Sequence, residues 1–231
     1  MNNHTLKSYD IQLGQLTQSI LQMGTLVRTM VLNSGKALIH KDASLVETAV
    51  TTDRKINELY ATVENQATIL LALQNPMAVD LRFVTSALKI ADSLEQAGDL
   101  AKNITKRSQK MGAYSARRIE KPINEMVESV VRMLDDALSA IETRDPKKAM
   151  QVWMQDDEVD EQYHQLLNQI QQEIQSDPSN VEACTHVVFS IKNFERIGDY
   201  ATSMAKTVYY VTSGQPASKD ALRAAMAAMQ Q

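Results

Sequence analysis

The stretch Leu94-Glu95-Gln96-Ala97-Gly98-Asp99 decides the fold, because the chain repeats it 100 residues later as Phe194-Glu195-Arg196-Ile197-Gly198-Asp199. Nearer the N-terminus of each copy the shift between matching residues is 103, and the change of three falls at a turn. The residues that recur at this shift are Ala37, Asp42, Asp53, Glu58 and Tyr60, which fall on Ala140, Asp145, Asp156, Glu161 and Tyr163. A match of this extent indicates an internal duplication of about 100 residues rather than a short solenoid repeat.

The composition favours long helices joined by short connections. The 231 residues include only seven glycines and five prolines, and aromatic residues make up 5%. A β-sandwich or barrel needs many Gly/Pro turns and many aromatic or β-branched residues. A Rossmann-type sheet needs glycine-rich turns between strand and helix. The sequence therefore predicts an all-α protein.

Short polar residues, most of them followed by proline, mark the expected helix starts. Asn or Asp suits the N-cap, and proline suits the first helical position, where no backbone N–H is needed. The starts marked in this way are Asn75-Pro76, Asp145-Pro146 and Asp177-Pro178, with Lys121-Pro122 as a fourth and Asp42 as a fifth without proline. The expected helices cover about 5–40, 43–73, 76–110, 118–143, 146–175 and 178–213, with a short seventh helix over 219–230.

Three helices per copy predict two tandem, duplicated three-helix bundles related by a pseudo-two-fold axis. We expect residues 1–115 to form the first bundle, residues 116–214 the second, and residues 215–231 a short C-terminal helical tail. A unit of about 100 residues is large enough to enclose a hydrophobic core of its own.

Charge, cysteine content and hydropathy exclude several classes of protein. Lys and Arg number 24 against 28 Asp and Glu, so the net charge is −4. No basic cluster stands out beyond Lys102–Arg118, and nucleic-acid binding is not expected. The single thiol, Cys184, lies in an apolar stretch and fits a core residue in a reducing compartment. No secretory signal and no run of about 18 apolar residues is found, so a soluble, cytoplasmic protein is expected.

Acidic side chains recur four residues apart on matching helices of the two copies. The positions are Asp53, Asn57, Glu95 and Asp99 in the first copy and Asp156, Asp160, Glu195 and Asp199 in the second. Positions i and i+4 share a helix face, where like charges repel by a few tenths of a kcal/mol. A bound cation would remove this repulsion, and hard cations suit all-oxygen sites. The sequence therefore predicts one metal site per half, for Mg, Mn, Fe, Zn or Ca. The two sites are expected to be unequal, since Asn57 replaces an acid and Lys192 stands where the first copy has Asp92.

Two other interpretations of these residues remain open. Glu161 and His164 form the i, i+3 pair of carboxylate-bridged di-iron bundles, but those bundles use the pair twice, and Ala61 stands at the first-copy position of His164. Because one such pair is present, a ferritin-like metal oxidase is one alternative. A purely structural helical module with solvated acids is the other. No nucleophile–base pair or phosphate-binding loop is found, so an enzyme is not expected.

The stretch Gln74-Asn-Pro-Met-Ala-Val-Asp-Leu-Arg82, together with Glu95/Asp99 and Glu195-Arg-Ile-Gly-Asp199, resembles the PhoU family of bacterial phosphate transport system accessory proteins. The resemblance covers about residues 8–214. It implies two three-helix bundles with metal clusters, usually multinuclear, held by the acidic motifs. The first motif departs from the family pattern, because Gln96 stands where the second copy keeps Arg196.

The resemblance also implies a regulatory function. Proteins of this family are thought to connect the phosphate ABC transporter, through its ATPase subunit PstB, to the sensor histidine kinase PhoR, and to repress phosphate-starvation genes when phosphate is plentiful. The chain is accordingly expected to be a cytoplasmic, metal-binding negative regulator and a homodimer, peripheral to the membrane through its partners. Asp80, Arg82 and Arg196 are the candidate partner contacts.

Overall fold

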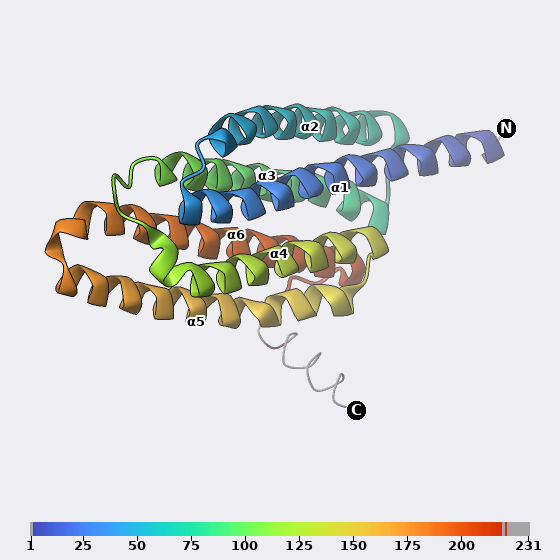
Figure 1. Cartoon of the computed structure of the whole chain (residues 1–231). Coiled ribbons are helices and arrows are strands. Elements are labelled where there is room, and N and C mark those ends of the chain that lie inside the picture. Colours follow the sequence, from blue (N-terminus) through green and yellow to red (C-terminus); the bar gives the residue numbers. More distant parts are fainter. Residues whose placement is uncertain (1, 219, 221–231) are drawn as a thin grey trace.

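The structure, a computed structural model, describes the backbone of residues 2–218 and 220 (Figure 1). These described residues form six long helices and two short 3-10 helices. In chain order these are α1 (Asn2–His40), α2 (Ser44–Gln74), α3 (Ala78–Ser108), η1 (Ala116–Ile119), α4 (Glu120–Thr143), α5 (Pro146–Ser176), η2 (Pro178–Asn180) and α6 (Val181–Ser213). The described residues contain no strand, so the predicted all-α fold is confirmed. The helix predicted over 219–230 lies outside the described residues.

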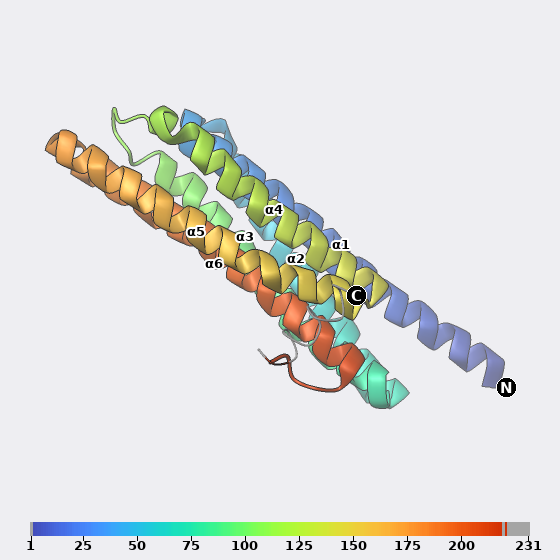
Figure 2. The ribbon, with the colours of Figure 1, turned by 90° about the horizontal axis from the view of Figure 1, so that it is seen from below.

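The six helices are arranged in four tiers (Figure 1). The α2 helix covers one side, α5 covers the opposite side, and α1 with α3 and α4 with α6 fill the middle. Helix α3 packs against α6, and α1 packs against α4, so corresponding helices of the two copies meet each other. In the view from below, these partners run side by side along the length of the molecule (Figure 2). Since each copy contributes its first and third helix to the middle, the copies are related by a pseudo-two-fold rotation.

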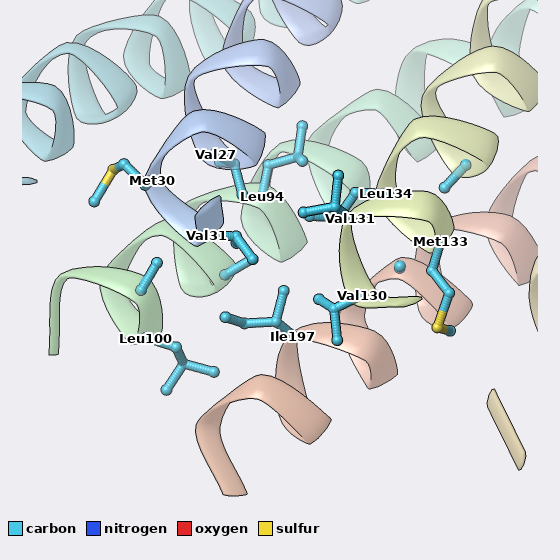
Figure 3. Close-up of a cluster of buried hydrophobic side chains, with 14 of the residues drawn as sticks. Val27, Met30, Val31, Leu94, Leu100, Val130, Val131, Met133, Leu134 and Ile197 are labelled. Carbon is cyan, nitrogen blue, oxygen red and sulfur yellow. The ribbon is translucent and has the colours of Figure 1, made fainter. Parts of the chain in front are cut away.

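One hydrophobic core runs through both copies. Buried apolar side chains of all six helices belong to a single packed cluster. At its centre, Val31 of α1 and Leu94 of α3 approach Val130 and Leu134 of α4 and Ile197 of α6 (Figure 3). The two bundles therefore share their largest apolar faces. Cys184 is fully buried, in agreement with the prediction.

Most predicted helix ends are correct to within a few residues, and their caps explain why. The Asp145 side chain accepts a hydrogen bond of 2.8 Å from the backbone N–H of Lys147, and Pro146 is the first residue of α5. The Asp42 carboxylate accepts the backbone N–H of Ser44, where α2 begins. Gly214 ends α6 in the left-handed conformation, at φ = 72°.

Two of the predicted starts are wrong in detail. Asn75 adopts a left-handed conformation and ends α2 rather than capping the next helix, so α3 begins at Ala78 instead of residue 76. Asn tolerates this conformation better than most non-glycine residues. It therefore occurs both at the left-handed end of one helix and at the N-cap of the next. Asp177 does precede a helical turn, but the turn is the 3-10 helix η2, and α6 begins only at Val181.

Glycines allow α1 and α4 to approach closely. A Cβ added at Gly24 would lie 2.3 Å from Leu138 Cδ2, and one at Gly35 would lie 2.9 Å from Val127 Cγ2. The same pair of helices is joined by Arg28, whose Nε donates to both carboxylate oxygens of Asp135 at 2.8 and 2.9 Å. None of the helices in the described part of the chain carries an apolar run of the length that a bilayer requires.

Candidate functional site

The predicted metal-ligating residues form two groups on opposite sides of the molecule, each between an outer helix and a middle helix. We call Asp53 and Asn57 of α2 with Glu95 and Asp99 of α3 the first acidic cluster. We call Asp156 and Asp160 of α5 with Glu195 and Asp199 of α6 the second acidic cluster.

In the first acidic cluster, Lys102 already provides a cation. Its Nζ lies 2.8 Å from Asp53 Oδ2 and 2.7 Å from Asp99 Oδ1, and its side chain is only 16% exposed. Burial lowers the pKa of Lys102, but the hydrogen bonds to Asp53 and Asp99 outweigh burial and raise it overall. The ammonium therefore stays charged and joins α2 to α3.

The other two members of the first acidic cluster lie outside this ion pair. Burial raises the pKa of Glu95, and the negative charges of Asp99 and Asp53 raise it further. Asn57 is exposed. Lys102 thus binds two carboxylates and offsets one of their two negative charges, and Glu95 lies beside them.

The second acidic cluster has Thr202 at the position that matches Lys102. The Thr202 hydroxyl donates a hydrogen bond of 3.1 Å to Asp156 Oδ1, and it brings no charge. Burial raises the pKa of Asp156. It also raises the pKa of Asp199, to about 6, and the negative charges of Glu195, Asp156 and Asp160 act in the same direction. The charge of Asp199 is therefore opposed by the other three carboxylates of the cluster.

Glu195 supplies a further sign of an incomplete site. Lys192 Nζ donates to its Oε1 at 2.6 Å from the exposed side, whereas its buried Oε2 has no hydrogen-bond partner among the described residues. A buried carboxylate oxygen without a partner costs free energy, and a cation would relieve this cost.

Neither cluster is a preformed coordination sphere. No group of three or more His, Cys, Asp or Glu side chains in the described part of the chain is placed to hold a metal ion. The second acidic cluster thus has the ligand chemistry of a hard cation, and its side chains would have to turn toward a common centre. In the first acidic cluster, the Lys102 ammonium lies between two of the carboxylates.

Gly98 and Gly198, which the sequence places beside the acids, differ in how tightly they are packed. A Cβ at Gly98 would lie 3.0 Å from Ile56 Cδ1, so α2 and α3 approach closely there. At Gly198 the nearest atom, Val159 Cγ1, would be 3.5 Å away, which is an ordinary contact. Close approach of the two helices at this glycine is thus found at the first acidic cluster only.

The other predicted site residues lie elsewhere. Glu161 and His164 are exposed and belong to neither cluster, and Gln165 donates a hydrogen bond to Glu161. Asp80 lies 3.8 Å from Arg144 of the second copy, and Arg82 Nε donates to the backbone carbonyl of Val211 at 3.1 Å. Both therefore connect the two copies at one end of the molecule. Arg196 is exposed.

The residue that sequence reasoning missed is Lys102. The signal was present, since a lysine three residues after Asp99 lies on the same helix face as that acid, and Thr202 stands at the matching position. The prediction used only positions at which the two copies agree, and at this position they differ, with Lys102 in the first copy and Thr202 in the second.

Fold and site together define a class of protein: an all-helical duplication in which each copy carries an acidic motif on its third helix. The PhoU domain model matches the chain twice, over residues 20–108 and 123–208. The chain therefore belongs to the PhoU family.

Individual relatives agree with this assignment. The chain is 38% identical over 216 residues to the phosphate-specific transport system accessory protein PhoU homolog of Caulobacter vibrioides strain NA1000, covering 93% of this chain and 94% of that protein. It is 34% identical over 212 residues to the homolog of Rhizobium meliloti, covering 91% and 90% of the two chains.

Solved structures show the same fold. The crystal structure of PhoU from Pseudomonas aeruginosa superposes with a TM-score of 0.84 at 27% identity, covering 90% of this chain and 100% of that one. The regulatory protein PhoU of the phosphate transport system from Streptococcus pneumoniae superposes with a TM-score of 0.83 at 28% identity, covering 91% and 99%.

Proposed function

We propose that this protein is a non-enzymatic negative regulator of phosphate uptake and of the phosphate-starvation response. In this proposal it is a cytoplasmic, metal-binding adaptor between the phosphate ABC transporter, through PstB, and the sensor histidine kinase PhoR. The observation that carries the proposal is the match to named phosphate transport accessory proteins over nearly the whole length of both chains.

An apolar surface at the α2–α3 junction supports the adaptor role. Leu73 is 70% exposed and Met77 is 81% exposed, and Val79 and Leu81 beside them are also exposed. Adjacent exposed apolar side chains often mark a contact with another protein. The corresponding turn of the second copy is the polar segment Pro178–Asn180. We therefore place a partner contact at the apolar junction, defined as Leu73, Met77, Val79 and Leu81.

Two of the proposed partner residues also contact the second copy. Arg82 donates to the carbonyl of Val211, and Asp80 lies 3.8 Å from Arg144. Both side chains stay partly exposed, so in this proposal they lie beside the apolar junction and can contribute to the same contact.

The metal is proposed to bind at the second acidic cluster. Its four carboxylates, the partnerless Glu195 Oε2 and the raised pKa of Asp199 support a cation there. Bound metal would neutralise this face and order its side chains, and Mg, Mn, Fe, Zn and Ca all accept such oxygen ligands.

The regulatory proposal is tested in a bacterium whose own homologue has been deleted and whose phosphate-starvation promoter drives a reporter. The wild-type chain is expected to restore repression in high phosphate. The double variant Leu73→Gln/Met77→Gln is expected to lose repression and to lose binding to purified PstB or to the cytoplasmic part of PhoR.

The control is Val181→Gln, since Val181 is an exposed apolar residue at the other end of the molecule. It should repress like the wild type. Failure of the wild-type chain to repress would refute the regulatory role, and normal repression by the double variant would refute the apolar junction as the contact. Sedimentation equilibrium tests the homodimer that we include in the proposal.

A further inference from the structure

We propose that Lys102 permanently occupies the cation position of the first acidic cluster, so that this protein takes up metal at the second acidic cluster alone. This inference rests on the proposed metal binding and departs from the expectation of one metal site per half. In this proposal the Lys102 ammonium offsets carboxylate charge in the first acidic cluster, as a bound metal ion does in the second.

The position of Lys102 supports this assignment. Its ammonium reaches one carboxylate on each of the two helices that form the cluster, Asp53 on α2 and Asp99 on α3, at 2.8 and 2.7 Å. Asp53 is itself buried, and Asp99 Oδ2 is held in addition by Asn103 Nδ2 at 2.9 Å. A divalent cation binding to these oxygens would have to displace a charged group that is tethered to the same helix.

The second copy has no equivalent of this ammonium. Thr202, at the matching position, joins α6 to α5 by a single hydrogen bond to Asp156 and carries no charge. Lys192 donates to Glu195 and also lies over the Tyr163 ring, 5.2 Å from the centroid, and its side chain is 46% exposed. Lys206 lowers the pKa of Asp156 through its charge, but its Nζ lies over the Trp153 ring, 4.4 Å from the centroid. The second acidic cluster therefore lacks a buried cation of its own.

The two clusters also differ in formal charge. Three carboxylates and the Lys102 ammonium give the first acidic cluster a formal charge of −2, whereas the four carboxylates of the second give −4. Asp160, at the position of Asn57, adds a fourth carboxylate to the cluster that has no buried lysine. Lys192, which pairs with Glu195 where the first copy has Asp92, offsets part of this difference.

The test exchanges the two residues. Chelator-treated full-length protein is titrated with Mn²⁺, and bound metal is measured by calorimetry and by the loss of the free Mn²⁺ signal in electron paramagnetic resonance. In the wild type, Glu195→Gln/Asp199→Asn should abolish binding, and Asp53→Asn/Asp99→Asn should leave the Mn²⁺ content unchanged.

Replacement of Lys102 should make the first acidic cluster available to Mn²⁺. Lys102→Thr, and Lys102→Met as a second variant of similar length, should bind additional Mn²⁺ that Asp53→Asn/Asp99→Asn then removes. The reverse change, Thr202→Lys, should weaken binding at the second acidic cluster by more than about tenfold, because a like charge about 4 Å from the ion opposes it even at the dielectric constant of water. Lys55→Thr, which removes an exposed lysine of α2, is the matched control and should change nothing.

The outcomes separate the two proposals. Mn²⁺ bound at the first acidic cluster of the wild type, or no gain in either folded Lys102 variant, overturns the inference about Lys102. A wild type that binds no Mn²⁺ while the Lys102 variants bind it at the first acidic cluster supports this inference and refutes the proposed metal binding. No binding in any variant refutes both.

Discussion

Asp199 is the residue at which protonation and stability are most clearly linked. Asp199 is exposed at the surface, but its partial desolvation, together with the charges of Glu195, Asp156 and Asp160, raises its pKa to about 6. An aspartate in an unfolded chain has a pKa near 3.9, so between about pH 4 and pH 6 the folded protein binds a proton that the unfolded chain does not. The free energy of unfolding of the metal-free protein should therefore fall as pH rises through this range.

Asp199→Asn removes this titration. We expect the metal-free variant to be more stable than the wild type at pH 7, by up to about 1 kcal/mol after allowance for the solvent exposure of the group. Its stability should also change less between pH 4 and pH 6. Urea unfolding of both proteins with chelator present measures the difference. A variant less stable than the wild type at pH 7 would show that the Asp199 charge is already compensated.

At the residue scale, the sequence predicts which acids share a helix face but not their electrostatic surroundings. Matching positions in a duplicated chain select the eight cluster residues, because helix periodicity fixes which positions share a face, and their role as metal ligands stays a prediction. Whether a neighbouring lysine reaches across to the next helix depends on the packing distance between helices, and no sequence pattern states that distance. The sequence therefore places Lys102 on the same face as Asp99, but its bond to Asp53 on the neighbouring helix needed the structure.

At the scale of helices, the contact between α1 and α4 depends on small residues. Gly24→Ala would place a methyl group against the buried Leu138 side chain. Overpacking of this kind typically costs about 1–3 kcal/mol, which exceeds the gain of about 1 kcal/mol from replacing glycine in a helix. We expect a net loss of unfolding free energy, measured by denaturant titration.

Gly14→Ala is the matched control for this change. Gly14 lies on the same helix, and a Cβ there would meet no atom within 4 Å. This variant should be as stable as the wild type or more stable, by up to about 1 kcal/mol. Equal effects at Gly14 and Gly24 would mean that α1 and α4 can move apart without cost.

Helix number and order could be predicted from the sequence, and the roles of the connecting residues only in part. The Asp145-Pro146 pair behaves as predicted because both residues favour the same structure, a helix start. Asn75 favours two structures, an N-cap and a left-handed helix end, and tertiary packing of α2 against α3 selects the second. The close contacts of Gly24 and Gly35 needed the structure, since a helical glycine does not reveal what it faces.

At the scale of the whole molecule, the shared core predicts cooperative unfolding. The apolar faces of α1 and α3 are covered by α4 and α6, so neither copy can unfold without exposing the other. The chain has one tryptophan, Trp153, which lies in the second copy, whereas far-ultraviolet circular dichroism reports helices of both copies. We expect the two signals to follow a single urea transition with the same midpoint.

Separate midpoints would show that the copies are independent domains. An expressed fragment of residues 1–115 provides a second measurement, and we expect it to be aggregated or only partly folded. The full-length protein with Asp145→Ala, a cap variant expected to lose about 0.5–2 kcal/mol, serves as a control that shifts both signals together.

The positions of the chain ends have a consequence for the order of the repeats. Helix α1 begins, and α6 ends, at the same end of the molecule (Figure 1), where Arg82 binds the carbonyl of Val211. A circularly permuted chain that starts at α4, crosses from α6 to α1 through a linker and stops after α3 would retain all the helix pairs. The same architecture is therefore expected for either order of the two repeats. In both orders the first and second acidic clusters would keep their different charges.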